Sequence, residues 1–234
     1  MAPTPKQTPG GQTPPARDLS ETLMAIYRAC RQRFGDLHWW PGEGALEICV
    51  GAILTQNTNW SNVEKAIARL QAAGAMNLPA LGRLEPAELG ELIRPAGYYN
   101  VKARRLKAFI AAVADWPGGL AAFLDRPAEA LRADLLAVNG IGPETADSMI
   151  LYAAERPVFV VDAYTLRIFR RHGLLESSAG YDEAQRLFEQ NLPRDAGLWN
   201  DYHAQVVMVG KHHCKPTARC ENCPLAGFPH DPNL

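Results

Sequence analysis

The chain has 234 residues, of which 47% are hydrophobic, so it can form one large or two modest hydrophobic cores. Its formal net charge of −1 excludes a protein that binds nucleic acid over its whole surface, and any such binding must be local. No run of about 18 apolar residues occurs and the N-terminus has no apolar signal core, so we expect neither membrane insertion nor secretion, and a cytoplasmic location.

Residues 1–18 are rich in Pro, Thr, Gly and Gln, which predicts a disordered tail. From residue 19 the apolar spacing is helical, and Gly35 ends this first helix. Further helices are predicted at 43–55, 61–73, 85–94, 100–115, 127–137, 143–155, 162–172, 181–191 and 195–210. The stretch SNVE, at 61–64, has the form of a capping box. Only RPVFVV, at 156–161, looks like a strand; we interpret it as a buried link, which makes the protein all-α.

The stretch VNGIGPETADSMILYA, at 138–153, predicts a tight hairpin between two helices. Gly140 and Gly142 allow the turn, and Pro143 suits the first turn of the second helix. The uncovered amides of such a hairpin and of the following helix N-terminus can hold a phosphate without net positive charge. An ordinary helix–helix turn is the alternative, which a bare Gly-x-Gly would favour.

Five stretches stand in the order and at the spacing of one known family: ILTQNTNWSNVEKA, IRPAGYYNVKARRL, LAVNGIGPETAD, FVVDAYTLRIFRR and CKPTARCENCPL. Through them the chain resembles the helix-hairpin-helix (HhH-GPD) DNA glycosylases related to endonuclease III, over most of residues 18–224. The resemblance implies a monomeric base excision repair enzyme that acts on double-stranded DNA. It also implies a six-helix barrel-like domain (39–155, with the helix-hairpin-helix at 131–155) inserted into a second helical domain (19–38 and 156–234). The damaged base would be flipped into the cleft between them.

Asp162 takes the place of the family's catalytic aspartate. A buried carboxylate there can stabilise the positive charge that develops on the sugar and orient or deprotonate water. Asp162 also suits the N-cap of the helix that follows it, and the two roles are compatible. Glu144 stands where the lyase members carry the lysine whose amine forms a Schiff base. Because a carboxylate cannot form an imine, we expect a monofunctional hydrolase; Lys211 or Lys102 would have to supply a displaced amine.

Trp40, Pro41 and Trp60 resemble the aromatic pocket of the 3-methyladenine glycosylase branch, and Lys211 is assigned to the same pocket. An electron-poor alkylated purine gains stacking and cation–π attraction from such rings. Core packing is the alternative for the tryptophans, and it is the one we expect for Trp39. We therefore predict removal of alkylated bases. The alternatives are an endonuclease III-type glycosylase and AP lyase for oxidised pyrimidines, and a non-catalytic DNA-damage binding module.

The resemblance also assigns residues to the DNA contact. Either Gln56 or Asn57 would fill the gap left by the flipped base, and Tyr98 would wedge the opposite strand. The basic runs at 102–107 and 167–172 are candidates for phosphate contact, or solvated helix faces. The predicted hairpin and phosphate contacts are Gly140, Ile141, Gly142, Thr145 and Lys102.

Three cysteines near the C-terminus, Cys214, Cys220 and Cys223, form the metal-ligand pattern C-x5-C-x2-C-P-L. Endonuclease III relatives hold a [4Fe–4S] cluster on four cysteines in this region. No fourth cysteine follows, so His230 is the candidate fourth ligand, ahead of Asp231. Tetrahedral zinc and an empty loop are the alternatives. Cys30 and Cys49, on apolar helix faces, are predicted to be buried thiols.

Overall fold

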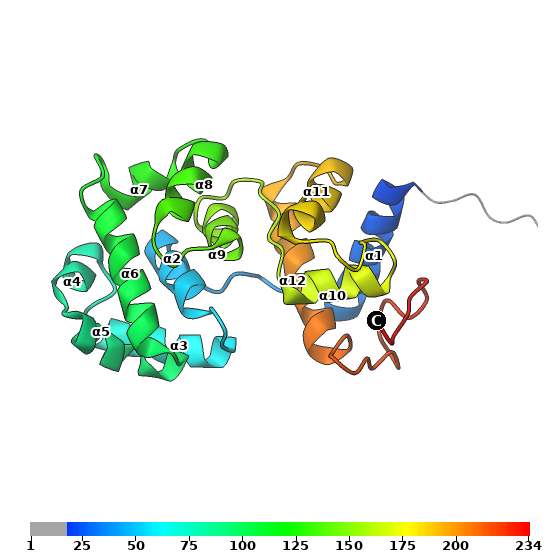
Figure 1. The fold of residues 1–234 in the computed structure, drawn as a ribbon, viewed down its shortest axis with the longest axis horizontal. Coiled ribbons are helices and arrows are strands. Elements are labelled where there is room, and N and C mark those ends of the chain that lie inside the picture. The colour runs from blue at the N-terminus through cyan, green and yellow to red at the C-terminus, as the bar shows by residue number, and fades with distance from the viewer. Residues whose placement is uncertain (1–17) are drawn as a thin grey trace, which may run out of the picture.

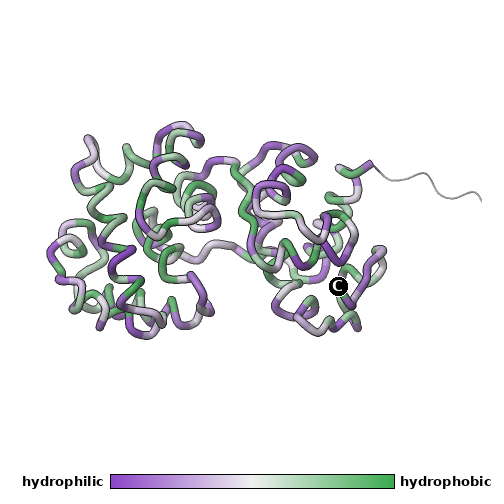
Figure 2. Tube along the Cα trace, in the orientation of Figure 1, coloured by the Kyte–Doolittle hydropathy of each residue, from purple (hydrophilic) through white to green (hydrophobic). Residues whose placement is uncertain are grey.

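The computed structural model describes residues 18–234, and every regular element in that range is helical, which confirms the all-α prediction (Figure 1). The tail predicted at 1–18 lies outside the described residues except for its last position. None of the described helices is long and apolar enough to cross a bilayer. The strand-like 156–161 segment is an extended link, and its hydrophobic residues 158–161 are buried where it passes between two lobes (Figures 1 and 2).

The hairpin lobe, on the left of Figure 1, carries the helix-hairpin-helix. Its helix α6 lies at the centre of the core, where Leu106, Phe109 and Ile110 are buried. Burial of each such side chain contributes about 1.5–3 kcal/mol. The elements of this lobe are α2 (Ala45–Leu54), α3 (Trp60–Ala72), α4 (Leu78–Arg83), α5 (Pro86–Leu92), η1 (Arg94–Ala96), α6 (Tyr99–Ala114), α7 (Gly119–Leu124), α8 (Ala128–Ala137), α9 (Pro143–Ser148) and η2 (Met149–Ala153).

The terminal lobe, on the right of Figure 1, joins the first helix of the described chain to the last three. Its core is aromatic: the rings of Phe159 and Phe188 stack with centroids 3.9 Å apart, and Tyr202 packs edge-on to both. Tyr152, from η2, belongs to this core, so the hairpin lobe reaches into it. The helices of this lobe are α1 (Leu19–Phe34), α10 (Ala163–Arg171), α11 (Tyr181–Asn191) and α12 (Ala196–His212).

The capping box predicted at 61–64 is wrong. Helix α3 begins at Trp60, and the cap is Asn59, whose side chain accepts a hydrogen bond from the N–H of Asn62 at 3.1 Å. Ser61 therefore lies inside the first turn and donates to the Asn59 side chain at 2.7 Å. Asparagine and serine are both good caps, and the polar run TQNTN offered several possible starts.

The main differences in helix boundaries have local causes. The helix predicted at 85–94 is divided into α5 and η1, because Pro95 has no N–H to continue an α-helix. The helix predicted at 143–155 changes into the π-helical turn η2 after Ser148. Helices α4 and α7, each six residues long, were missed because they are too short for periodicity to show.

The two cysteines predicted to be buried thiols are buried. Cys30, in α1, and Cys49, in α2, are 1% and 0% exposed. Burial raises the pKa of both thiols to about 12, so neither forms a reactive thiolate at neutral pH.

Candidate active site

A cleft of ≈ 2150 Å³ opens between the two lobes. The hairpin, the turn before α3, the N-terminus of α10 and one face of α12 form its walls. It brings together residues that are far apart in the sequence and that sequence reasoning singled out: Trp39, Trp40, Gln56, Asn57, Trp60, Gly140, Gly142, Glu144, Thr145, Asp162 and Lys211.

Asp162 is the N-cap of α10, and its side chain is 12% exposed at the cleft. Its Oδ1 accepts hydrogen bonds from the N–H of Thr165 at 2.7 Å and from the Thr165 hydroxyl at 2.8 Å. Its Oδ2 makes no part of the cap and lies 3.7 Å from Nε2 of His203. The carboxylate therefore caps the helix with one oxygen and directs the other toward His203.

His203, in α12, is the partner of Asp162. The imidazole is 5% exposed, and its Nδ1 lies 2.5 Å from the hydroxyl of Tyr152. When that hydroxyl donates to Nδ1, the ring carries its hydrogen on Nε2, facing Asp162. Burial alone would raise the pKa of Asp162, but His203 and the two Thr165 donors hold it below its usual 3.8. Asp162 is therefore ionised at neutral pH.

Glu144, in the first turn of α9, lines the same cleft. Desolvation in the cleft, and then the negative charge of Asp162, raise the pKa of Glu144 above its usual 4.5, and His203 opposes the shift. The pKa of Asp162 is therefore lowered while the pKa of Glu144 is raised, so the two carboxyl groups lose their protons at different pH. Such a separation is typical of carboxyl pairs that divide acid–base roles.

Gln56 braces the hairpin. Its Nε2 donates to the carbonyl of Gly140 at 3.1 Å and to the hydroxyl of Thr145 at 2.9 Å, while Arg105 donates to its Oε1. Gly140 has φ 86°, and a Cβ there would lie 2.3 Å from Cγ of Arg105, so only glycine fits this turn. Both ends of the Gln56 amide are thus engaged inside the protein.

Asn57 and Tyr98 are exposed tips. Both have left-handed backbone conformations, with φ 53° and 46°, and Tyr98 is 72% exposed. Such conformations cost about 1–3 kcal/mol each for L-residues and occur most often at functional positions. Within residues 18–234 the Asn57 side chain makes no hydrogen bond, so of the two candidates for the gap only Asn57 is free to leave the protein surface.

Lys102 does not lie at the surface, and its predicted phosphate contact is wrong. The residue is 1% exposed, and its Nζ donates to the carbonyls of Leu54 and Ala96 at 2.8 Å each. Burial, and then the charge of Arg105, lower the pKa of Lys102 to about 8. Lys102 shares a helix face with buried Leu106, four residues on, and this spacing was the signal that sequence reasoning missed. The same burial excludes Lys102 as a displaced amine.

Three tryptophans form one wall of the cleft. The ring of Trp40 lies between Trp60, at 4.8 Å and 80°, and Tyr152, at 4.8 Å and 30°. Trp39, expected in the core, packs on Trp40 at 6.0 Å and also lines the cleft. The indole N–H groups of all three tryptophans are buried without a hydrogen-bond partner among the described residues.

Pro41 lies outside this cleft, so its assignment to the base pocket is wrong. It lines a smaller pocket, with Glu43 and Glu47, that shares only Trp60 with the cleft. Lys211, at the end of α12, is exposed on the cleft, and its Nζ lies 5.5 Å from the centroid of the Trp39 ring.

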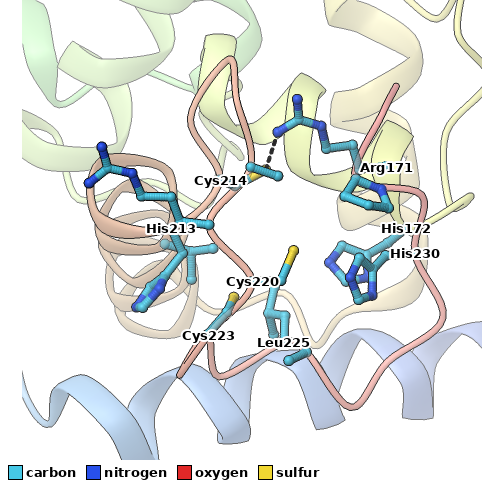
Figure 3. A pocket seen from close by; sticks show the side chains of 13 residues that line it. Arg171, His172, His213, Cys214, Cys220, Cys223, Leu225 and His230 are labelled. Atoms are coloured by element: carbon cyan, nitrogen blue, oxygen red, sulfur yellow. Dashed lines mark hydrogen bonds between the residues drawn. The ribbon is translucent and has the colours of Figure 1, made fainter.

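The predicted metal ligands line one pocket of ≈ 340 Å³ beyond α12 (Figure 3). Arg171 donates to Sγ of Cys214 at 3.3 Å. His230 and His172 both line this pocket, with Nδ1 2.8 Å from the carbonyl of Phe228 and 2.9 Å from that of Pro229. A ring that donates through Nδ1 keeps its Nε2 lone pair, the usual state of a ligating histidine. Over residues 18–234, no three His, Cys, Asp or Glu side chains form a group that could hold one metal ion.

Sequence reasoning missed two residues of this site, His203 and Tyr152, and named Arg105 only as part of the basic run 102–107, without its contact with Gln56. Each lies on a helix whose pattern is otherwise explained by core packing, and its partner is distant in sequence, 41 residues away for His203 and Asp162. The only local signal was a single histidine on the buried face of α12.

Comparison with known proteins agrees with this geometry. The family model for the HhH-GPD superfamily base excision DNA repair protein matches residues 50–194. A Methanocaldococcus jannaschii protein named as a candidate DNA repair glycosylase is 44% identical over 89% of this chain and 96% of its own length. Endonuclease III of Thermotoga maritima is 28% identical over 75% of this chain and 78% of that enzyme.

Solved structures show the same fold. The H. pylori 3-methyladenine DNA glycosylase bound to 1,N6-ethenoadenine aligns with a TM-score of 0.72 at 29% identity, over 83% of this chain and 97% of that chain. A non-covalent endonuclease III–DNA complex aligns with a TM-score of 0.78 at 21% identity, over 91% of this chain and 96% of that chain. At this identity the likeness shows the fold alone. The chain therefore belongs to the HhH-GPD superfamily of base excision DNA repair proteins, has the endonuclease III-like fold, and is a DNA glycosylase.

Proposed function

We propose that this protein is a monomeric, monofunctional glycosylase that hydrolyses the N-glycosidic bond of alkylated, 3-methyladenine-type bases in duplex DNA. One observation carries the proposal: Glu144 shares a tryptophan-walled cleft with Asp162. A carboxylate in place of the lyase amine supports hydrolysis, and the aromatic wall supports an electron-poor base. The 29% identical glycosylase with bound ethenoadenine adds support for a purine.

The two carboxyl groups and one water account for the reaction. As the bond from C1′ to the base nitrogen breaks, its electron pair leaves with the base, and an alkylated cationic base departs neutral. The ionised Oδ2 of Asp162 stabilises the positive charge on the sugar. Glu144, with its raised pKa, takes a proton from the water that attacks C1′. His203 keeps Asp162 ionised and oriented, as its 3.7 Å separation supports.

The aromatic wall suits recognition of the flipped base. Trp40 and Trp60 line the cleft and offer aromatic surface to a flipped base. Lys211 already lies over Trp39, and its ammonium would repel a cationic base. The base therefore contacts Trp40 and Trp60, and Lys211 stays at the rim of the cleft.

Different parts of the hairpin lobe contact the DNA backbone and fill the space that the flipped base leaves in the duplex. The hairpin at 138–142, fixed by Gln56, presents amides to a phosphate beside the cleft. Asn57 fills the space left by the flipped base, and Tyr98 separates the opposite strand. The exposure and left-handed backbone of both tips support these roles.

We also propose that Cys214, Cys220, Cys223 and His230 hold a [4Fe–4S] cluster. Four corners of a cluster need ligands that surround a volume, whereas one zinc ion needs ligands that converge on a point. The shared lining of one pocket by the three cysteines and His230 supports a common metal group. When bound, it would cross-link the end of α12 to the C-terminal segment.

The test is an activity panel on duplexes that carry 3-methyladenine, thymine glycol or uracil. We expect release of 3-methyladenine and intact abasic strands. Cleavage at thymine glycol would favour the oxidised-pyrimidine lyase, for which Lys211 is the one lysine that lines the cleft in the described chain. Binding without release of any base would favour the damage-binding module.

A further inference from the structure

One buried charged group has no role in the mechanism above. Lys102 extends from α6 into the interior, and its Nζ donates to two main-chain carbonyls, those of Leu54 and Ala96, at 2.8 Å each. Leu54 is the last residue of α2, and Ala96 is the last residue of η1. The ammonium therefore lies where the carbonyl ends of two helical segments meet, a place that favours positive charge.

Each of these helix ends leads directly into one of the exposed tips. Asn57 follows Leu54 by three residues, and Tyr98 follows Ala96 by two. Both tips have left-handed backbones, which persist only when the surrounding structure holds them. Lys102 is the group that both segments share, although they are about forty residues apart in the chain.

We propose that Lys102 is a positioning residue that fixes the Asn57 and Tyr98 tips relative to each other, so that both enter the DNA together at the flipped nucleotide. The inference rests on the roles given to the tips under the proposed function. Without the ammonium, two buried carbonyls lose their donor and each tip moves independently. The chemistry at Asp162 is unaffected once the base has reached the cleft.

The same helix offers a matched control. Lys107 also caps a helix end, and its Nζ donates to the carbonyls of Leu81, Gly82 and Leu84 at 3.3, 2.6 and 2.9 Å. These carbonyls belong to the end of α4, which leads into α5 and carries neither tip. Lys107→Met thus removes the same kind of interaction without affecting the tips.

The experiment measures insertion directly. A duplex carries a tetrahydrofuran abasic analogue with 2-aminopurine opposite it, and stopped-flow fluorescence follows the unstacking of that base. We expect Lys102→Met to slow the fluorescence rise at least about tenfold, because it loses two hydrogen bonds from a charged group, and Lys107→Met to leave it unchanged. Because this duplex contains no damaged base, the result does not depend on which lesion the enzyme removes.

A second background tests whether Lys102 acts through the tips. In Asn57→Ala/Tyr98→Ala protein, addition of Lys102→Met should slow insertion no further. Equal slowing of insertion by Lys102→Met and Lys107→Met in the native background would overturn the proposal. Further slowing by Lys102→Met in the Asn57→Ala/Tyr98→Ala protein would overturn it as well.

If Lys102→Met does not fold, native-state hydrogen exchange of the unmodified protein tests the proposal instead. The proposal requires the amides of 55–58 and 97–99 to open together, with one denaturant dependence. Separate opening of the two segments would overturn it.

Discussion

The carboxylate of Asp147 in α9 accepts a hydrogen bond at 2.8 Å from the hydroxyl of Tyr181 in α11, and so joins the two lobes. Asp147 is completely buried, and Arg132 and Gln185 also donate to it, at 2.7 Å and 2.8 Å. Tyr181 itself lines the cleft. The width of the cleft at Asp162 therefore depends on this junction.

Tyr181→Phe should lower both the stability and the rate of base release. Loss of a hydrogen bond to a charged group costs about 1.5–3 kcal/mol, and the lobes gain freedom to separate. Tyr27→Phe is the matched control, because the Tyr27 hydroxyl donates to Asp201 at 2.6 Å within the terminal lobe. Urea unfolding should show a lower free energy of unfolding for both variants. Single-turnover release of the base should slow only for Tyr181→Phe. Equal kinetic effects would show that the junction does not control the cleft.

Asp162→Asn should keep the fold and the affinity for DNA while base release falls by orders of magnitude. Asparagine is as good an N-cap as aspartate, so α10 stays capped, and the hairpin is untouched. The neutral amide no longer stabilises charge on the sugar. Urea unfolding and electrophoretic mobility shift measure the retained properties, and single-turnover kinetics measures the lost one. Release at the rate of the unmodified protein would remove Asp162 from the mechanism.

The pH profile of base release should depend on Glu144. Desolvation in the cleft and the charge of Asp162 raise the pKa of Glu144, and only the ionised form takes a proton from water, so activity should fall as the pH drops through a value above 4.5. Glu144→Gln should be slower at neutral pH and should lose this acid limb. The remaining limb then reports Asp162, whose lowered pKa places it below 3.8. An unchanged limb in Glu144→Gln, after subtraction of spontaneous depurination, would assign it to another group.

The metal pocket makes a prediction that needs no activity assay. Purified protein should be yellow-brown, and elemental analysis should find about four irons per chain. His230→Ala should lose the colour faster in air, whereas His172→Ala, which alters a second histidine of the pocket, should not. Colourless protein with one zinc per chain would identify the zinc alternative.

The sequence predicted the long helices and the all-α class, because their apolar spacing extends over several turns. The resemblance to the family singled out Asp162 and Glu144, and the Gly-x-Gly pattern before a helix predicted the hairpin. What the sequence missed depends on distant contacts. The ammonium of Lys102 is held by two carbonyls that lie 48 and 6 residues away in the chain. The histidine that faces Asp162, His203, comes from α12. The helical spacing places Lys102 and His203 on buried faces, but it does not identify the groups that they meet there.

The Schiff-base test separates hydrolysis from lyase chemistry. A lyase is trapped on DNA when borohydride reduces the imine that links its amine to the sugar, and Glu144 has no amine to form one. The protein should therefore release base, leave the abasic strand intact until alkali is added, and give no adduct. Glu144→Lys should restore some trapping, because residue 144 lines the same cleft as Asp162. Trapping by the unmodified protein that Lys211→Ala abolishes would contradict hydrolysis and make Lys211, which is exposed at the cleft, the nucleophile.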